Sequence, residues 1–178
     1  EEESTGQPMR IPDKDYLRRT CEEWHWCLAN GKPMAFIKSR RLIVSWLCTA
    51  LEVHVAGITP GNILVSGDTY EGNNGAKSFV RRHAFIYRQL RVRFPEWKLP
   101  KALESGGNYM AGELSKVVLA TGASIQAVNS DGESFRGGGT SIVRMEELSQ
   151  WPNASIAWTQ AQIAVQRPPG KVGGFAYA

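Results

Sequence analysis

One stretch of the chain constrains its fold more than any other: a short apolar run, then a basic turn, then a long apolar segment. Residues 34–37 read M-A-F-I, residues 38–41 read K-S-R-R, and residues 42–56 are mostly apolar with helical spacing. This order predicts a buried strand, a turn and a buried helix. At the carboxyl end of a strand, the N-terminus of the next helix offers unpaired N–H groups and partial positive charge to an anion. The stretch therefore predicts a phosphate site, with a solvated basic turn as the alternative.

The turn does not contain the consecutive Gly-Lys-Ser/Thr motif of a standard phosphate-binding loop. It nevertheless supplies the chemistry that such a loop needs, namely a cation for the phosphate oxygens and a hydroxyl for Mg²⁺ at the head of the helix. Lys38 would be the cation and Ser45 the hydroxyl. Arg40 or Arg41 would reinforce the lysine.

The rest of the chain alternates between helical and extended patterns. Its 178 residues, 42% apolar and 10% aromatic, suit one domain with one core. The spacing predicts helices over 15–29, from the basic turn to 57 and over 72–94; strands over 34–37, 62–66 and 141–145; a helix or irregular segment over 158–166; and the start of a strand at 173–178. Two β-rich runs, 116–120 and 124–129, predict a hairpin or two adjacent strands. Such alternation predicts an α/β fold with a mainly parallel sheet covered on both faces.

Charge and cysteine content exclude some classes of protein and leave others open. The net charge of +4 and the pI near 9.1 are compatible with a nucleic-acid partner and equally with an ordinary basic protein. Three cysteines without C-x-x-C spacing argue against a zinc site or a disulfide framework and favour a reducing compartment. The apolar stretches are strand-sized or broken by charges, so we expect no membrane span and no signal peptide.

A second basic region lies in the helix predicted over 72–94 and just beyond it. Residues 77–98 hold seven Lys or Arg side chains against one acid, Glu96. Such a helix can track a phosphate backbone, and a solvated helix face is the alternative.

Two adjacent carboxylates follow the strand predicted over 141–145. In a nucleotide hydrolase the first acid at such a strand end, here Glu146, holds Mg²⁺, and the second, Glu147, orients or deprotonates the attacking water. An acidic pair also commonly starts a helix. Its position about a hundred residues after a basic strand-to-helix turn favours the hydrolase interpretation.

Together these segments resemble the ATPase domain of the large terminase subunit of tailed bacteriophages, the motor that packages viral DNA. K-S-R-R-L-I-V-S-W at 38–46 resembles the family's deviant Walker A loop, S-I-V-R-M-E-E-L at 141–148 its Walker B strand, and S-F-R-G at 134–137 its arginine loop. The resemblance spans residues 36–147. It implies a P-loop NTPase fold of the RecA/ASCE-like type, a three-layer sandwich around a mainly parallel sheet.

The resemblance also implies a role for each matching residue. Ser45 and Glu146 would hold Mg²⁺, Glu147 would be the catalytic carboxylate, and Arg136 would act as an arginine finger that completes the neighbouring subunit's site. Lys38 and Arg41 would contact phosphates. The ATP-binding loop as a whole would comprise Lys38, Ser39, Arg40, Arg41, Leu42, Ile43, Val44 and Ser45. The implied cofactors are ATP and Mg²⁺.

The sequence departs from the family pattern at three points. Ile43 stands where the family often has glycine, and a β-branched residue disfavours a positive φ. Glu146 replaces the usual aspartate, so its carboxylate reaches one methylene further. No glutamine matches the family's adenine contact, since Gln7 lies in the polar N-terminal tail.

The resemblance implies a homo-oligomeric ring that uses ATP to drive double-stranded viral DNA into a procapsid, with the portal protein and the small terminase subunit as partners and no membrane. The motor would work in the host cytoplasm, transiently docked on the procapsid portal. Residues 1–14 would be a tail and residues 15–178 the ATPase domain, which stops before the family's coupling motif and nuclease domain. Because an isolated domain lacks the neighbouring subunit that would supply Arg136 in trans, we expect weak hydrolysis by the domain alone. A helicase-like DNA-remodelling ATPase and a non-catalytic DNA-binding module are the alternatives.

Overall fold

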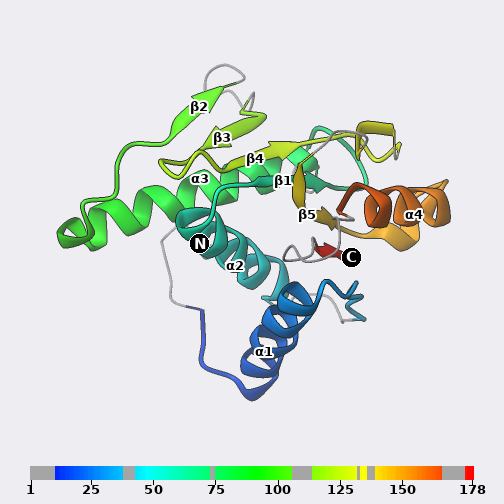
Figure 1. Cartoon of the computed structure of the whole chain (residues 1–178), viewed down its shortest axis with the longest axis horizontal. Coiled ribbons are helices and arrows are strands. Elements are labelled where there is room, and N and C mark those ends of the chain that lie inside the picture. Colours follow the sequence, from blue (N-terminus) through cyan, green and yellow to red (C-terminus); the bar gives the residue numbers. More distant parts are fainter. Residues whose placement is uncertain are drawn as a thin grey trace.

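A six-stranded sheet forms the centre of the protein (Figure 1). The computed structural model describes residues 11–37, 43–72, 75–105, 114–131, 133–135, 139–165 and 175–178. The strand order is β2-β3-β4-β1-β5-β6. The strands are β1 (Asn62–Ser66), β2 (Leu103–Ser105), β3 (Lys116–Val118), β4 (Ser124–Ala127), β5 (Thr140–Met145) and β6 (Phe175–Tyr177). β4, β1, β5 and β6 run parallel, and β3 pairs antiparallel with both β2 and β4.

An extended segment ahead of the second helix continues the sheet beyond β6. Met34 N donates to Ala176 O at 3.1 Å, and Phe36 N donates to Ala178 O at 2.8 Å. The segment forms a single parallel bridge, from Met34 to Tyr177, rather than a regular strand. The strand predicted over 34–37 is therefore present as a hydrogen-bonded extended segment at the end of the sheet.

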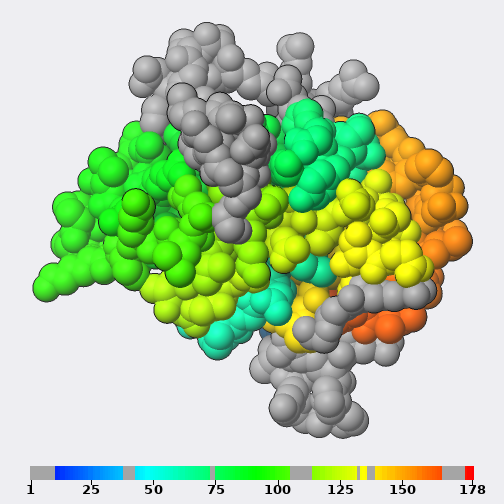
Figure 2. All heavy atoms as spheres, turned by 90° about the horizontal axis from the view of Figure 1, so that it is seen from above, coloured from blue at the N-terminus to red at the C-terminus, as the bar shows by residue number. Residues whose placement is uncertain are grey.

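Helices cover both faces of the sheet. On one face of the sheet, a single hydrophobic core includes residues of α1 (Asp15–Asn30), α2 (Val44–Ile58) and α3 (Ala76–Arg93). On the other face, α4 (Ala154–Val165) packs against the sheet in a second core. Short 3-10 turns are η1 (Pro95–Trp97), η3 (Glu133–Phe135) and η4 (Leu148–Gln150). In Figure 2, α3 in green and α4 in orange lie at opposite ends of the molecule. The predicted α/β fold with a mainly parallel, two-sided sheet is confirmed. Within the described residues, no helix is both long and apolar enough to cross a membrane.

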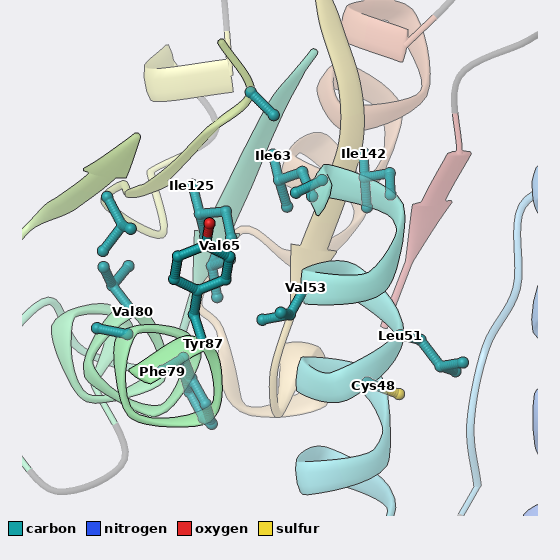
Figure 3. Packing of buried hydrophobic residues seen from close by; sticks show 14 of the residues in the cluster. Cys48, Leu51, Val53, Ile63, Val65, Phe79, Val80, Tyr87, Ile125 and Ile142 are labelled. Atoms are coloured by element: carbon teal, nitrogen blue, oxygen red, sulfur yellow. The ribbon is translucent and has the colours of Figure 1, made fainter. Parts of the chain in front are cut away.

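The larger core lies between the sheet and helices α2 and α3 (Figure 3). Alternate residues of the central strands point into it, and α2 and α3 supply the facing side chains; the labelled members are Cys48, Leu51, Val53, Ile63, Val65, Phe79, Val80, Tyr87, Ile125 and Ile142. On the opposite face, Val143 and Met145 of β5 pack with α4. A strand buried on both faces is mostly apolar, which explains the apolar runs at 63–65 in β1 and 142–143 in β5.

Three elements differ from the prediction. α3 begins at Ala76 rather than at residue 72, because the preceding bend supplies acceptors for its first turn: Ala76 N donates to Thr69 O at 2.9 Å. α4 begins at Ala154 rather than at residue 158, after a turn at Pro152 and Asn153. The sequence does not predict β2, a three-residue edge strand too short to show apolar alternation.

β3 and β4 form a hairpin, which decides between the two alternatives for these runs. Leu119 N donates to Ala123 O at 2.8 Å across the turn. Gly122 has a φ of +83°, a conformation that glycine adopts without a Cβ clash. The Thr121 hydroxyl donates to Ala56 O at 2.6 Å and so ties the hairpin to the end of α2.

The three cysteines are free thiols, and the two most buried are Cys27 and Cys48. Burial raises the pKa of Cys48 to about 12. That thiol is therefore protonated and unreactive at neutral pH.

Replacing Ile63 by Ala should lower the free energy of unfolding by about 2–5 kcal/mol, because Ile63 lies in a central strand and is only 2% exposed. Ile156→Ala removes the same atoms from the surface of α4, where the side chain is 55% exposed, and should change stability by at most about 0.5 kcal/mol. Urea unfolding followed by circular dichroism measures both variants. Equal effects would contradict the central position of β1.

Candidate functional site

The carboxyl ends of β1 and β5 meet the first turn of α2 at one edge of the sheet. Because the two strands are parallel neighbours, the residues that follow them lie side by side, and Glu146 N donates to Ser66 O at 2.9 Å. α2 begins at Val44, shortly after the extended segment that pairs with β6. In open α/β sheets, ligands bind outside the carboxyl ends of the strands. We therefore expect a ligand site at this edge.

Two of the predicted site residues are in contact at this edge. The Ser45 hydroxyl of α2 donates to Glu146 Oε2 at 3.2 Å, although the residues are 101 positions apart in the sequence. Ser45 is half-buried, and the Glu146 side chain is 14% exposed. A hydroxyl oxygen and a carboxylate are thus held together, with partial access to solvent.

These two oxygen donors fit Mg²⁺ better than a transition metal. Where the structure describes the chain, no group of three or more His, Cys, Asp or Glu could hold a metal ion. Mg²⁺ does not need such a group, since proteins usually bind it through one or two carboxylates together with phosphates and water. The pair would suit a metal that arrives with a phosphate ligand.

The start of α2 shows how Ile43 fits at the head of the helix. Ile43 has a φ of −66° and precedes the helix, and its carbonyl accepts from Leu47 N at 3.0 Å. The negative φ is open to a β-branched residue. The absence of glycine at this position therefore causes no backbone strain at Ile43.

A buried arginine holds the Ser45–Glu146 pair in place. Arg144 lies on β5 and is fully buried. Its Nε donates to Glu146 Oε1 at 3.0 Å, and Nη2 donates to the same oxygen and to Ser45 O, the latter at 3.0 Å. Nη1 donates to Thr49 Oγ1 at 2.9 Å and to Glu52 Oε2 at 3.0 Å. Every one of the five guanidinium N–H donors therefore has an acceptor.

Glu52 of α2 anchors the other side of this arginine. Its Oε2 also accepts from His83 Nε2 at 2.6 Å, and its Oε1 accepts from the Tyr177 hydroxyl at 2.7 Å. His83 Nδ1 lies 2.7 Å from Phe79 O, so it has to be the donor in that bond. We call Arg144, Thr49, Glu52, His83 and Tyr177 the arginine cluster.

The partners in this cluster decide the ionisation of the buried groups. Burial alone would raise the pKa of Glu52, but Arg144 and His83 outweigh it and hold the pKa below its ordinary value. Burial would lower the pKa of Arg144, and the neighbouring Glu146 raises it well above its ordinary value. Burial and Glu52 raise the pKa of Tyr177, which stays a hydrogen-bond donor. Arg144 and Glu52 therefore stay charged and form a buried ion pair.

Glu147 lies next to the pair but has a different environment. Its side chain is exposed, and its backbone has φ 55° and ψ 34°, in the left-handed region. Such a conformation is uncommon for a residue with a Cβ, costs about 1–3 kcal/mol and is enriched at active sites. An exposed carboxylate beside Glu146 is therefore a candidate for proton transfer.

The sequence matches no protein-family model and no curated protein. Among solved structures, the HK97 bacteriophage large terminase is similar, with a TM-score of 0.64 over 98% of this chain and 14% sequence identity. This chain has a terminase large-subunit-like fold. The likeness confirms the terminase-like α/β fold that the motif resemblance implies, and the P-loop NTPase type stays a prediction. This chain covers 34% of that terminase, about a third of its length.

The remaining predicted site residues are not placed in this terminase-like fold. Lys38, Ser39, Arg40, Arg41, Leu42 and Arg136 lie outside the described residues. Their roles stay predictions. Of the predicted nucleotide loop, the structure describes Ile43, Val44 and Ser45, and Val44 is buried.

Sequence reasoning misses the arginine cluster, although a signal for it exists. Arg144 interrupts the apolar run of β5, and Glu52 interrupts the apolar run of α2. A charged side chain in a segment buried by its neighbours has to be paired, because an unpaired buried charge is strongly unfavourable. The sequence indicates that partners exist but does not say which residues they are.

The contacts of α3 bear on the DNA-binding alternative. Four of the seven basic side chains interact with the protein itself: Lys77 pairs with Glu71, Arg82 lies over the Trp46 and Phe79 rings, Arg88 pairs with Glu104, and Arg91 Nε donates to Leu99 O. Most of these basic side chains therefore make contacts within the terminase-like fold. The helix does not favour a DNA-binding module over an ATPase.

Acid should destabilise the terminase-like fold through Glu52. Burial would raise the pKa of this carboxylate, and the groups that face it, Arg144, His83 and Tyr177, together hold the pKa below the ordinary 4.5. A lowered carboxyl pKa gives stability that is fully present above pH 4.5 and is lost as the pH falls through the folded-state value. The free energy of unfolding, measured with urea from pH 6 to pH 3, should therefore fall on acidification.

In Glu52→Gln, the free energy of unfolding should fall less steeply between pH 6 and pH 3 than in the parent chain. Asp13→Asn is the matched control, because Arg18 also lowers the pKa of Asp13, but at an exposed site where ion pairs contribute little. The same slope in Glu52→Gln and in the parent chain would contradict the assignment.

Proposed function

We propose that this chain binds ATP with Mg²⁺ and hydrolyses it, as the ATPase part of a motor that moves double-stranded viral DNA into a procapsid. The observation that carries the proposal is the contact between Ser45 and Glu146 at the carboxyl edge of a terminase-like sheet. A hydroxyl at the head of a helix beside an acid at the end of a strand is the donor pair with which P-loop NTPases hold Mg²⁺.

The residues of this edge suggest how the site would work. Ser45 would turn its proton away from Glu146 and offer its oxygen as a ligand, and Glu146 would support the metal directly or through water. Mg²⁺ in this position would neutralise charge that develops on the phosphates during transfer of the terminal phosphoryl group. The first N–H groups of α2 would add to this charge stabilisation.

The other roles follow the sequence prediction. Lys38 and Arg41 would contact the phosphates, and Glu147 would orient or deprotonate the attacking water. Arg136 would reach the site of a neighbouring subunit in a homo-oligomeric ring. The ring would work in the host cytoplasm on the procapsid portal, with the portal protein and the small terminase subunit as partners.

Ser45→Ala should weaken Mg²⁺-dependent binding of a non-hydrolysable ATP analogue by about tenfold or more, because it removes a metal ligand. Ser155→Ala is a matched control: Ser155 is also the second residue of a helix, α4, but lies on its exposed surface. Lys38→Ala should weaken binding both with and without metal. Calorimetry of the three variants with Mg²⁺ and with EDTA measures these effects. Equal affinities of the parent and of Ser45→Ala for the analogue in the presence of Mg²⁺ would contradict the proposed metal site.

Glu147→Gln should lower ATP turnover by the DNA-engaged motor by about 10²–10⁴-fold, the usual contribution of a general base, while analogue affinity stays unchanged. Glu96→Gln, at an exposed position in η1, is the control and should keep full turnover. A steady-state phosphate-release assay separates the two outcomes. Normal turnover in Glu147→Gln would remove this residue from the chemical step.

A further inference from the structure

We propose that Arg144 is a positioning residue, which fixes the Ser45–Glu146 pair in the geometry that one divalent cation requires. This inference rests on the proposed function, since it concerns the same metal site. It assigns a role to a buried side chain that would act through Ser45 and Glu146. Its basis is the set of bonds that Arg144 makes to both halves of the pair.

Arg144 leaves the Glu146 carboxylate little freedom to turn. Nε and Nη2 both donate to Oε1, so this oxygen faces the guanidinium. The second oxygen, Oε2, then faces the Ser45 hydroxyl at 3.2 Å. Rotation of the carboxylate would break two charge-assisted hydrogen bonds in a buried place, where such bonds are strong.

Arg144 also fixes the head of α2. Nη2 donates to Ser45 O, and the Thr49 hydroxyl donates to the same carbonyl at 2.8 Å. Nη1 in turn donates to Thr49 Oγ1. One guanidinium therefore holds both the backbone that carries the hydroxyl ligand and the carboxylate that faces it.

The rest of the arginine cluster holds the guanidinium itself. Glu52, bound by His83 and Tyr177, accepts from Nη1, so four elements (α2, α3, β5 and β6) share the arrangement. The Phe79 ring lies 4.8 Å from Arg144 Cζ. A lysine at position 144 would keep the charge but lacks the planar fork that serves Glu146, Ser45 and Thr49 at once.

Groups that orient metal ligands typically affect metal affinity by about 10–100-fold when they are replaced. Arg144→Met alone would leave buried carboxylates without their partner, which is strongly destabilising. The test variant is therefore Arg144→Met with Glu52→Gln, which removes one positive and one negative charge together. Arg88→Met with Glu104→Gln removes a more exposed ion pair, between α3 and β2, and serves as the matched control.

The experiment measures the affinity of the chain for a non-hydrolysable ATP analogue with Mg²⁺ and with EDTA, alongside thermal unfolding. For Arg144→Met/Glu52→Gln we expect a folded chain, unchanged affinity in EDTA, and a Mg²⁺ enhancement of affinity about 10–100-fold smaller than in the parent. The control should keep the full enhancement. Loss of the metal-dependent part alone distinguishes positioning from a general structural role.

A folded double variant with the full Mg²⁺ enhancement would overturn the role of Arg144 and leave the proposed function standing. Absence of any Mg²⁺ enhancement in the parent chain would overturn both. If the double variant does not fold, Arg144→Lys is the test variant, because it keeps the positive charge but lacks the planar guanidinium. A reduced enhancement in this variant supports the proposal, and an unchanged one overturns it.

Discussion

The structure depends on one buried charge, the guanidinium of Arg144. Taking such an ion out of water costs several kcal/mol, and an interior tolerates it only when opposite charges and hydrogen bonds replace the lost hydration. Here every guanidinium N–H has an acceptor, and the acceptors come from α2 and from the end of β5. Through Glu52 the same group reaches His83 on α3 and Tyr177 on β6. These elements cannot separate without leaving a charge unpaired.

This constraint explains how two distant segments form one site. Ser45 and Glu146 meet because the arginine between them requires acceptors from both, and the parallel sheet brings the ends of β1 and β5 to the same edge. The likeness to the HK97 large terminase, at 14% identity, carries the arrangement of elements and not the roles of residues. The proposed roles rest on local geometry: a hydroxyl, a carboxylate and the donors that bind them.

The sequence predicts what periodicity and local chemistry encode. α1, β1 and β5 lie where apolar spacing places them, and Ser45 and Glu146 lie at the predicted head of a helix and end of a strand. Their metal-binding role stays a prediction. β2 was not predictable, because a three-residue edge strand is defined by its pairing with β3 rather than by its own pattern. The arginine cluster was missed for a related reason. A lone charge in an apolar run predicts a partner, but only the tertiary structure pairs Arg144 with Glu52.

A crystal structure of the chain with Mn²⁺ and a non-hydrolysable ATP analogue tests this account most directly, since anomalous scattering locates the metal. The account predicts Mn²⁺ within direct ligand distance of Ser45 Oγ, about 2.0–2.2 Å as for Mg²⁺. Glu146 should support it directly or through a water, with the Arg144 bonds to Glu146 Oε1 and Ser45 O retained. A metal bound away from Ser45, or an Arg144 side chain released from both partners, would contradict it.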